Sequence, residues 1–379
     1  MRSLATARST CESFHPGLLS ELETIPLIER EAADSPVVEI YRKHSGPDLL
    51  VPTEYGGAAA DPLQAARVQR GLASVSPSLG VATVMHHFTV AMLFSLARSA
   101  QRLTAAQLRL LSSVVGDSLL LASGWAEGRT DQNILSPMVV AEPIPGGYRI
   151  NGSKKPCSLS TSMDVLTASV AIPEPDGSTS LALLLIPARL PGVTITPFWS
   201  TPVLAASQSH EVRLTDVELS AELVIRSTAA DQTRLDDLQT AGFTWFELLT
   251  SASYVGVASS LVAQVLASGR GSATDRAALA IRLEAAVNLV DGTARAIRDG
   301  VNGDEAVAMV LAARYASQDL LAGAVNIAVE MLGGMAFIHS PDVAYLASAV
   351  HALAFHPPSR SSVAPQLADY FAGGPLQLS

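Results

Sequence analysis

Residues 151–163 read NGSKKPCSLSTSM, and this stretch lies at the centre of the predicted fold. It follows Gly146 and Gly147, a pair that is typical of a tight turn between two strands. The apolar run 165–173 comes next and has the length and composition of a buried strand. Cys157 and Ser158 are therefore predicted to lie where a strand leaves a hairpin and turns, and we expect the functional site on this face of the sheet.

The composition indicates a folded protein with a large core and excludes several functional classes. The chain has 379 residues, of which 48% are hydrophobic and 16% charged, and this size suits two or three packed units. The net charge is −10, and the only lysines are Lys43, Lys154 and Lys155. No basic cluster supports nucleic-acid binding.

The cysteines and the apolar segments bear on the compartment. Cys11 and Cys157 lie far apart without metal-ligand spacing, so we expect neither a disulfide nor a metal site. The N-terminus lacks the apolar core of a signal peptide. The apolar run 306–329 is interrupted by Arg314 and Asp319, so we expect no membrane span and a cytoplasmic protein.

Hydrophobic periodicity changes twice along the chain and predicts an α+β protein of three units. Residues 1–117 are predicted as an N-terminal helical domain, 118–226 as an antiparallel β-barrel or sandwich, and 227–379 as a four-helix bundle. The strands are expected at 138–142, 148–151, 164–172, 179–186, 193–197 and 210–214, and the bundle helices at 235–267, 275–298, 304–332 and 342–354. Because 304–329 is apolar nearly all round, we expect a homodimer or homotetramer.

Three local motifs in this order resemble the acyl-CoA dehydrogenase superfamily over nearly the whole chain. They are VPTEYGG at 51–57, GYRINGSK at 147–154 and LGGMAF at 332–337. The resemblance implies an acyl-CoA dehydrogenase-like fold and a flavin held between the β-domain and the bundle.

The chain departs from the dehydrogenases where their catalytic carboxylate stands. Counted from Gly333 and Gly334, the family's Y-E-G-T motif falls on His356, Pro357, Pro358 and Ser359. Proline cannot accept a proton, so α,β-dehydrogenation by the usual arrangement is not available.

An alternative position for the base keeps the dehydrogenase hypothesis open. Other members carry the Glu in the first bundle helix, where Phe246 aligns and Glu247 follows one residue later. One residue rotates a helical side chain by about 100°. Glu247 is thus either the base of an acyl-CoA or acyl-carrier-protein dehydrogenase or the partner in a salt bridge or helix cap. A non-catalytic partner protein with this fold is a third alternative.

A second branch of the superfamily, the two-component flavin monooxygenases of the dibenzothiophene monooxygenase type, matches these departures better. Residues 156–158 (PCS), 87–88 (HF) and 355–358 (FHPP) resemble motifs of that branch. The resemblance implies a monooxygenase that receives reduced flavin from a separate flavin reductase. Its substrate would be a small molecule of specialised metabolism, free or bound to a carrier protein, oxidised at carbon, nitrogen or sulfur.

The resemblance also assigns candidate catalytic residues, each with a structural alternative. His356 is the predicted acid or hydrogen-bond donor, or else a histidine at a helix C-terminus. His87 is a second catalytic candidate and His86 a pocket residue, although a satisfied core histidine is common. Ser158 is expected to contact flavin N5, or else to cap a strand end. Cys157 is expected to be a small buried hydrophobic residue.

The remaining candidates concern the flavin and the substrate cavity. Trp125 and Ala126 occupy the strand that runs under the ring in the family, and Trp245 and Phe246 are predicted to line the cavity. The other predicted cofactor contacts are Arg129, Arg276, Gly333 and Gly334. Because the family's Gln contacts to the nucleotide are lost, with Glu330 before Gly333, we expect weakly held FAD or FMN.

Overall fold

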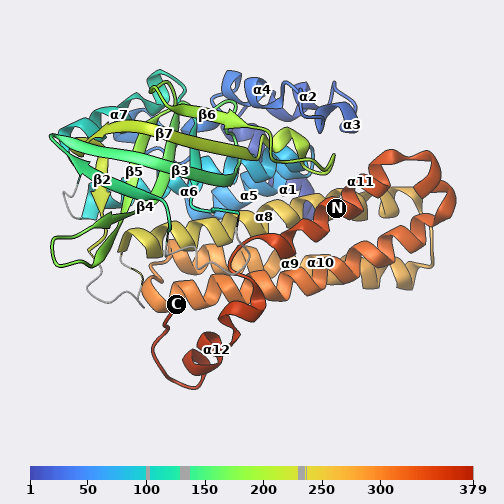
Figure 1. The fold of residues 1–379 in the computed structure, drawn as a ribbon. Helices are drawn as coiled ribbons and strands as arrows, with labels where there is room; N and C mark the ends of the chain where they lie inside the picture. Colours follow the sequence, from blue (N-terminus) through green and yellow to red (C-terminus); the bar gives the residue numbers. More distant parts are fainter. Residues whose placement is uncertain (100–102, 129–136, 229–234, 236, 379) are drawn as a thin grey trace.

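The computed structural model describes residues 1–99, 103–128, 137–228, 235 and 237–378. Helices come first, a sheet follows, and long helices close the chain (Figure 1). The α+β class and the acyl-CoA dehydrogenase-like fold are confirmed.

The N-terminal unit consists of short helices before two longer ones. Its α-helices are α1 (Arg2–Phe14), α2 (Leu18–Leu22), α3 (Leu27–Arg30), α4 (Val37–Lys43), α5 (Pro62–Ala73), α6 (Pro77–Ser99) and α7 (Ala105–Gly116). Asp61 and Thr104 begin α5 and α7 with capping boxes, each completed by a glutamine three residues later. Helix α1 was not predicted, because its buried residues Leu4, Ala7 and Cys11 form only a narrow apolar stripe.

The eight strands form one sheet with the order β6-β7-β3-β2-β4-β5-β8, and β1 pairs with β4. They are β1 (Leu121–Gly124), β2 (Val140–Ile144), β3 (Gly147–Cys157), β4 (Val165–Pro173), β5 (Thr179–Pro187), β6 (Val193–Thr196), β7 (His210–Ser220) and β8 (Val224–Arg226). The hairpin predicted around Gly146 and Gly147 is confirmed, with Ile144 opposite Gly147.

The expectation of a purely antiparallel sheet was wrong at β4. Strand β1 pairs with β4 in parallel, and so does Val140 of β2 with Ala171. The backbone N–H of Asp164 donates to the carbonyl of Leu120, and the Leu120 N–H donates to the Asp164 carboxylate, so both strands start side by side. All four residues of β1 are buried, and a short strand buried on both faces has no alternation to reveal it.

The C-terminal unit is built around α8 (Asp237–Ser268), which packs against α5, α6, α9, α10 and α11. Its other helices are α9 (Ala273–Arg298), α10 (Gly303–His339), α11 (Pro341–His351) and α12 (Arg360–Phe371). The predicted break at Gly333 is present as a kink inside α10, where Gly333 has φ 79° and ψ 165°. Only glycine adopts that backbone region readily. Helix α12 was not predicted, because Pro365 lies inside it and it has too few apolar residues to show a helical periodicity.

The N-terminal helices and the sheet share one hydrophobic core. A single cluster of buried side chains runs from Cys11 and Leu18 to Val217 and Ile225. The helices α8–α11 enclose a second cluster, and a small third one joins α12 to the first turns of α10.

Among the described residues, three helices are long and apolar enough to cross a membrane by length and composition, and one of them is α10, in which Arg314 and Asp319 were expected to interrupt the apolar run. In α6 and α8 the apolar windows are 89% and 83% buried inside the protein. In α10 only 28% of the window is buried, and the charged residue counted as an interruption there, Arg314, is fully buried. Most residues of this window are thus not fully buried by the chain itself.

Candidate active site

His356 lies in the segment that follows α11 and the 3-10 helix η5 (Ala352–Phe355). Its Nε2 lies 2.8 Å from the hydroxyl oxygen of Tyr254, which is fully buried on α8. Its ring also meets Phe246 edge-on, with the ring centroids 6.0 Å apart. Burial, and secondarily the charge of Arg314, lower the pKa of His356 to about 3. At neutral pH the imidazole is therefore uncharged and serves as a hydrogen-bond donor, whereas the sequence had left open a protonated acid.

Arg314 fixes the position of this segment by hydrogen bonds to its main-chain carbonyls. Its guanidinium donates to the carbonyl oxygens of Leu353, His356 and Pro357, at 3.4 Å for Leu353 and 3.2 Å for Pro357. The same side chain forms an ion pair with Glu247 of α8, with Nη1 2.8 and 2.9 Å from the two carboxylate oxygens. Both side chains are almost completely shielded from solvent.

This ion pair decides between the two readings of Glu247. The carboxylate is a salt-bridge partner between α8 and α10, not a free base, because both of its oxygens are bound by Arg314. Burial raises the pKa of Glu247 to about 7, and Arg314 opposes that rise. The pair fixes the position of His356 and leaves the dehydrogenase hypothesis without its base.

Aromatic side chains surround His356 on the side of α6. Phe246 is half-buried and meets Phe88 of α6 edge-on at 5.5 Å between ring centroids. Trp245, also half-buried, packs with Phe246 against the core shared by the N-terminal helices and the sheet. Phe246 therefore lies beside His356 as a cavity wall would, and Trp245 is its neighbour on α8.

The two adjacent histidines of α6 are core residues. The Nε2 of His86 lies 2.9 Å from the carbonyl oxygen of Pro47, and its Nδ1 accepts from the backbone N–H of Leu121. His87 places Nε2 2.6 Å from the hydroxyl of Tyr41, and burial keeps its pKa well below the usual value. Neither ring reaches His356 through a contact within the described residues, so we assign neither to the site. Both ring nitrogens of His86 and the Nε2 of His87 have partners inside the core, which favours the structural alternative for these two residues.

Ser158 begins a chain of three serine hydroxyls at the exit of β3. Its Oγ lies 2.8 Å from Oγ of Ser209, which lies 2.7 Å from Oγ of Ser207. Ser207 donates to the carbonyl of Leu204, so Ser209 must donate to Ser207 and Ser158 to Ser209. The Ser158 oxygen is left with lone pairs only, and it can accept a hydrogen bond from a ligand. The loop 204–209 also connects to α11, because the Leu204 N–H donates to the Tyr345 hydroxyl.

Trp125 and Ala126 lie next to this strand exit. The backbone N–H of Lys155 donates to the carbonyl of Ala126, and the Lys154 ammonium is paired with Glu127 at 2.5 Å. The indole Nε1 of Trp125 is buried without a partner among the described residues. A buried indole N–H usually finds an acceptor. This orphaned donor fits a ligand at the edge where the flavin is expected.

The kink of α10 opens a hollow on the protein surface. Gly333 and Gly334 line it together with Val329, Glu330, Phe337 and Ile338. Arg276 is not among the residues that line this hollow, and its Nη1 donates to the carbonyls of Gly269, Arg270 and Gly271 at the turn after α8. Its predicted phosphate contact would have to use its other nitrogens. Arg129 lies outside the described residues.

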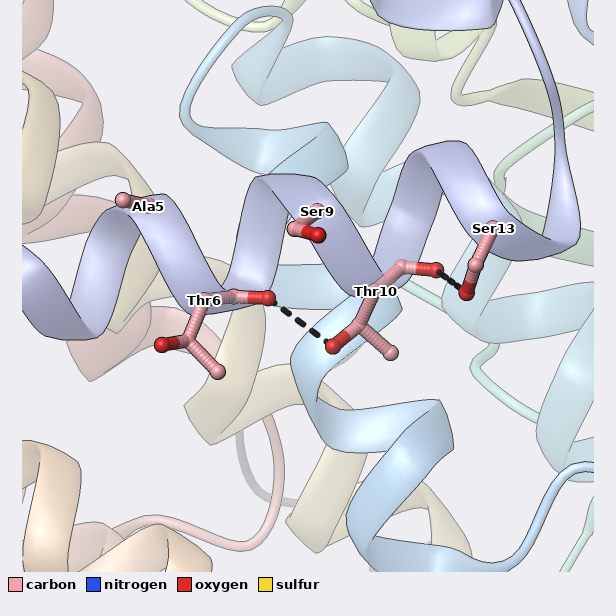
Figure 2. Close-up of a pocket in the computed structure, with 5 residues that line it drawn as sticks. All are labelled: Ala5, Thr6, Ser9, Thr10 and Ser13. Carbon is pink, nitrogen blue, oxygen red and sulfur yellow. Dashed lines mark hydrogen bonds between the residues drawn. The ribbon is translucent and has the colours of Figure 1, made fainter.

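Three further features of the described residues lie apart from the candidate site. Within the described ranges no group of His, Cys, Asp and Glu could hold a metal ion. Cys157 is buried and burial raises its pKa to about 12, which confirms it as a small buried residue. Figure 2 shows a shallow strip of small residues on α1, where Thr10 and Ser13 bond to the helix's own carbonyls. That strip lies on α1, whereas the candidate site is built from β3, α8, α10 and the segment after α11.

Sequence reasoning missed three residues that hold the site together. The sequence pattern marks Arg314 only as an interruption of an apolar helix, and it assigns no role to Tyr254 or Ser209. For Arg314 a signal existed, because a lone arginine in an apolar run needs a buried acid as partner. Tyr254 follows Glu247 by two helical turns and so lies on the same face of α8.

Comparison with known proteins agrees with this geometry. No protein-family model matches the sequence. Among solved structures, a nitrososynthase from Micromonospora carbonacea var. africana superposes with a TM-score of 0.82 at 20% identity, over 97% of this chain and 96% of that chain. Dibenzothiophene monooxygenase (TdsC) from Paenibacillus sp. A11-2 superposes with a TM-score of 0.77 at 18% identity, over 100% of this chain and 99% of that chain. At these identities the likeness concerns the fold.

A relative in sequence supplies the family. Isobutylamine N-hydroxylase from Streptomyces viridifaciens is 58% identical over 378 residues, which is 100% of both chains. The chain belongs to the flavin monooxygenases of the acyl-CoA dehydrogenase fold.

Membership of this monooxygenase family settles the choice among the three hypotheses drawn from the sequence. The protein is a flavin-dependent oxidoreductase, as predicted, and its cofactor is a flavin. The flavin monooxygenase is the favoured alternative that the comparisons confirm.

Proposed function

We propose that this monooxygenase N-hydroxylates a small primary aliphatic amine. The observation that carries the proposal is the 58% identity, over the full length of both chains, to isobutylamine N-hydroxylase. The balanced reaction is R–NH2 + O2 + reduced flavin → R–NHOH + H2O + oxidised flavin. One oxygen atom forms the N–O bond, the other leaves as water, and the two electrons come from the reduced flavin.

When bound, the reduced flavin supplies electrons and activates O2 for transfer of one oxygen atom. The residues that would hold it come from the exit of β3 and from the segment that follows β1. Ser158 offers an acceptor oxygen, and Trp125 offers an indole N–H that has no acceptor in the described part of the chain. The residues present therefore fit a polar ring ligand with both donors and acceptors on its edge.

The side of the site opposite Ser158 would hold the amine and keep water out. Phe88 and Phe246 supply apolar walls, and the neutral imidazole of His356 adds no positive charge to that wall. An uncharged wall favours the neutral form of an amine, whose nitrogen lone pair must be free to form the N–O bond.

FMN or FAD supplied in reduced form by a separate flavin reductase is part of the proposal. Solved relatives of this fold contain FMN or FADH2, as in KijD3 with FMN and XiaF with FADH2. The hollow at Gly333 and Gly334 carries Glu330 where the family has a glutamine, and a carboxylate repels phosphate. This supports weak, exchangeable binding of the nucleotide part. The two cysteines, both free and buried, are compatible with a cytoplasmic enzyme.

A homodimer or larger homo-oligomer is proposed from the uncovered apolar face of α10. Met335 and Ile338 are 62% and 72% exposed beside the kink, and only 28% of the apolar window of α10 is buried. A second copy of the chain would bury this face.

The oligomer can be tested by light scattering. The wild type should give at least twice the monomer mass, and Ile338→Asp should reduce that mass. Phe371→Asp, at an equally exposed phenylalanine on α12, should leave the mass unchanged; a monomeric wild type would refute the proposed oligomer.

The test of the proposed function uses the purified protein with chemically reduced FMN or FAD, O2 and isobutylamine. We expect a hydroxylamine heavier than the amine by one oxygen atom, with 18O entering from labelled O2. Isobutanol, which has the same carbon skeleton without the nitrogen, should give only hydrogen peroxide. Release of all the reducing equivalents as hydrogen peroxide with every primary aliphatic amine tried would refute the assignment.

A further inference from the structure

Tyr254 and His356 form a buried hydrogen-bonded pair whose proton positions can be derived. The hydroxyl of Tyr254 has one hydrogen-bond partner within the described residues, the Nε2 of His356 at 2.8 Å. Tyr254 is 0% exposed, so water does not offer an alternative partner. Burial raises the pKa of Tyr254, so the phenol keeps its proton.

Only one arrangement of protons satisfies this pair. If Tyr254 donates to Nε2, its single O–H is used and the imidazole carries its own proton on Nδ1. If Nε2–H donated instead, the buried O–H of Tyr254 would have no acceptor, and such a loss costs about 1–3 kcal/mol. The first arrangement is therefore the stable one.

The other nitrogen of His356 is open. Nδ1 makes no hydrogen bond within the described residues, and it is not among the buried atoms that lack a partner, so it is accessible. We propose that Tyr254 is a positioning residue that fixes His356 in the Nδ1–H tautomer and so aims a permanent N–H donor at the oxygen that leaves as water. This role rests on the proposed amine hydroxylation.

A second tyrosine–histidine pair in the same molecule shows the opposite arrangement. Tyr41 lies 2.6 Å from Nε2 of His87, but its hydroxyl donates to the carbonyl of Gly46 at 2.7 Å. The only proton of Tyr41 is used there, so His87 must donate from Nε2, and its Nδ1 is left bare and without a partner among the described residues. The proton of the tyrosine decides the tautomer in both pairs.

The charges around His356 keep its imidazole in the neutral form. Arg314 of α10 donates to the carbonyl of His356 itself, and Glu247 of α8 neutralises that guanidinium. The other ionisable group in contact is Tyr254, since Tyr315 of α10 bonds to the carbonyl of Pro358 at 3.0 Å. The nearest formal charge on the pair is thus positive, and it opposes a second proton on the imidazole.

The test reads the tautomer directly by nitrogen NMR of protein labelled with 15N-histidine, without flavin. Subtracting the spectrum of His356→Asn identifies the His356 signals, and subtracting that of His87→Asn identifies those of His87. We expect a protonated Nδ1 and an unprotonated Nε2 for His356, and the reverse for His87. This measurement on the wild type needs no variant of Tyr254 to fold.

A matched pair of variants connects the tautomer to turnover. Tyr254→Phe should shift His356 towards the Nε2–H form and lower the ratio of hydroxylamine to hydrogen peroxide about two- to tenfold, the value of one neutral hydrogen bond. The KM for the amine should change little. Tyr41→Phe removes the same hydroxyl at the other pair and should leave both the His356 signals and the product ratio unchanged.

The outcomes separate this inference from the proposed function. A wild-type His356 protonated on Nε2 overturns the inference, and so does a Tyr254→Phe protein with an unaltered product ratio. A wild type that makes no hydroxylamine from any amine refutes the proposed function, while the NMR result still decides the tautomer.

Discussion

Two buried ion pairs lie next to segments that carry candidate site residues, one pair in the sheet and one in the bundle. Lys154 pairs with Glu127 behind the exit of β3, and Arg314 pairs with Glu247 behind the segment of His356. Glu127 also accepts from the backbone N–H groups of Met138 and Val139, whereas within the described residues both oxygens of Glu247 are bound by Arg314 alone. The carboxylate anchors main chain in the first pair, and the cation does so in the second.

The comparison shows which partner is harder to replace in each pair. When the carboxylate has backbone donors, it keeps partners after the cation is removed. When the cation is the only partner, its removal leaves a buried charge uncompensated. The bundle pair should therefore tolerate loss of its arginine less well than the sheet pair tolerates loss of its lysine.

The largest effect is expected for Arg314→Met. The change strands Glu247 in the core and frees the carbonyls of Leu353, His356 and Pro357, so we expect a loss of about 3–5 kcal/mol in the free energy of unfolding. Urea denaturation followed by circular dichroism measures it. The double variant Arg314→Met/Glu247→Leu is the matched control and should recover most of the stability. Equal losses in the single and double variants would show that the carbonyl contacts, not the ion pair, carry the effect.

Lys154→Met should be milder. Glu127 retains its two backbone donors, so we expect a loss of about 1–3 kcal/mol. Because Lys154 lies next to the strand exit that carries Ser158, flavin affinity should fall as well, measured by fluorescence titration. Affinity that stays at the wild-type value would separate this ion pair from the flavin site.

His356→Ala should affect the chemistry of the bundle side, and it should also cost about 1–3 kcal/mol of stability because the buried hydroxyl of Tyr254 loses its acceptor. Loss of an N–H donor that meets developing charge is worth about 1.5–3 kcal/mol, which is about 10- to 100-fold in the ratio of hydroxylamine to hydrogen peroxide. His87→Ala is the control, since it removes a core histidine and should lower stability while it leaves that ratio unchanged. If His87→Ala uncouples the reaction as strongly, the assignment of His87 to the core is wrong.

The smallest effect concerns the pH dependence of stability in the bundle pair. The pKa of Glu247 is raised from 4.5 to about 7 in the folded protein. The folded state then binds more protons than the unfolded state over that range, so stability is full below pH 4.5 and falls as pH rises to about 7. Glu247→Gln cannot titrate and should lack this slope. Parallel profiles of unfolding free energy from pH 4.5 to 8 would contradict the raised pKa.

The sheet side of the site was more accessible to sequence reasoning than the bundle side. Ser158, Trp125 and Ala126 lie on a hairpin and its neighbour, and local turn and strand signals place such residues well. The hairpin turn, the break at Gly333 and the burial of Cys157 could be predicted for the same reason.

On the bundle side, long-range packing decides the contacts. Glu247 finds its partner 67 residues later, and Tyr254 contacts His356 across 102 residues. No spacing rule predicts such pairs, because they depend on the rotation of α8 against α10. The same limit explains why His86 and His87 were predicted as site residues. Their partners, the carbonyl of Pro47 and the hydroxyl of Tyr41, are distant in the sequence and lie in the interior.

The division of the interior into three clusters has a consequence for cooperativity. The N-terminal helices and the sheet share one core, so their amide hydrogens should exchange with solvent in a common opening event despite their different secondary structure. Helix α12 rests on a small cluster of its own with Val307, Leu311 and Tyr315 of α10. It forms the least protected unit, and it can detach from α10 while the remaining two cores stay closed.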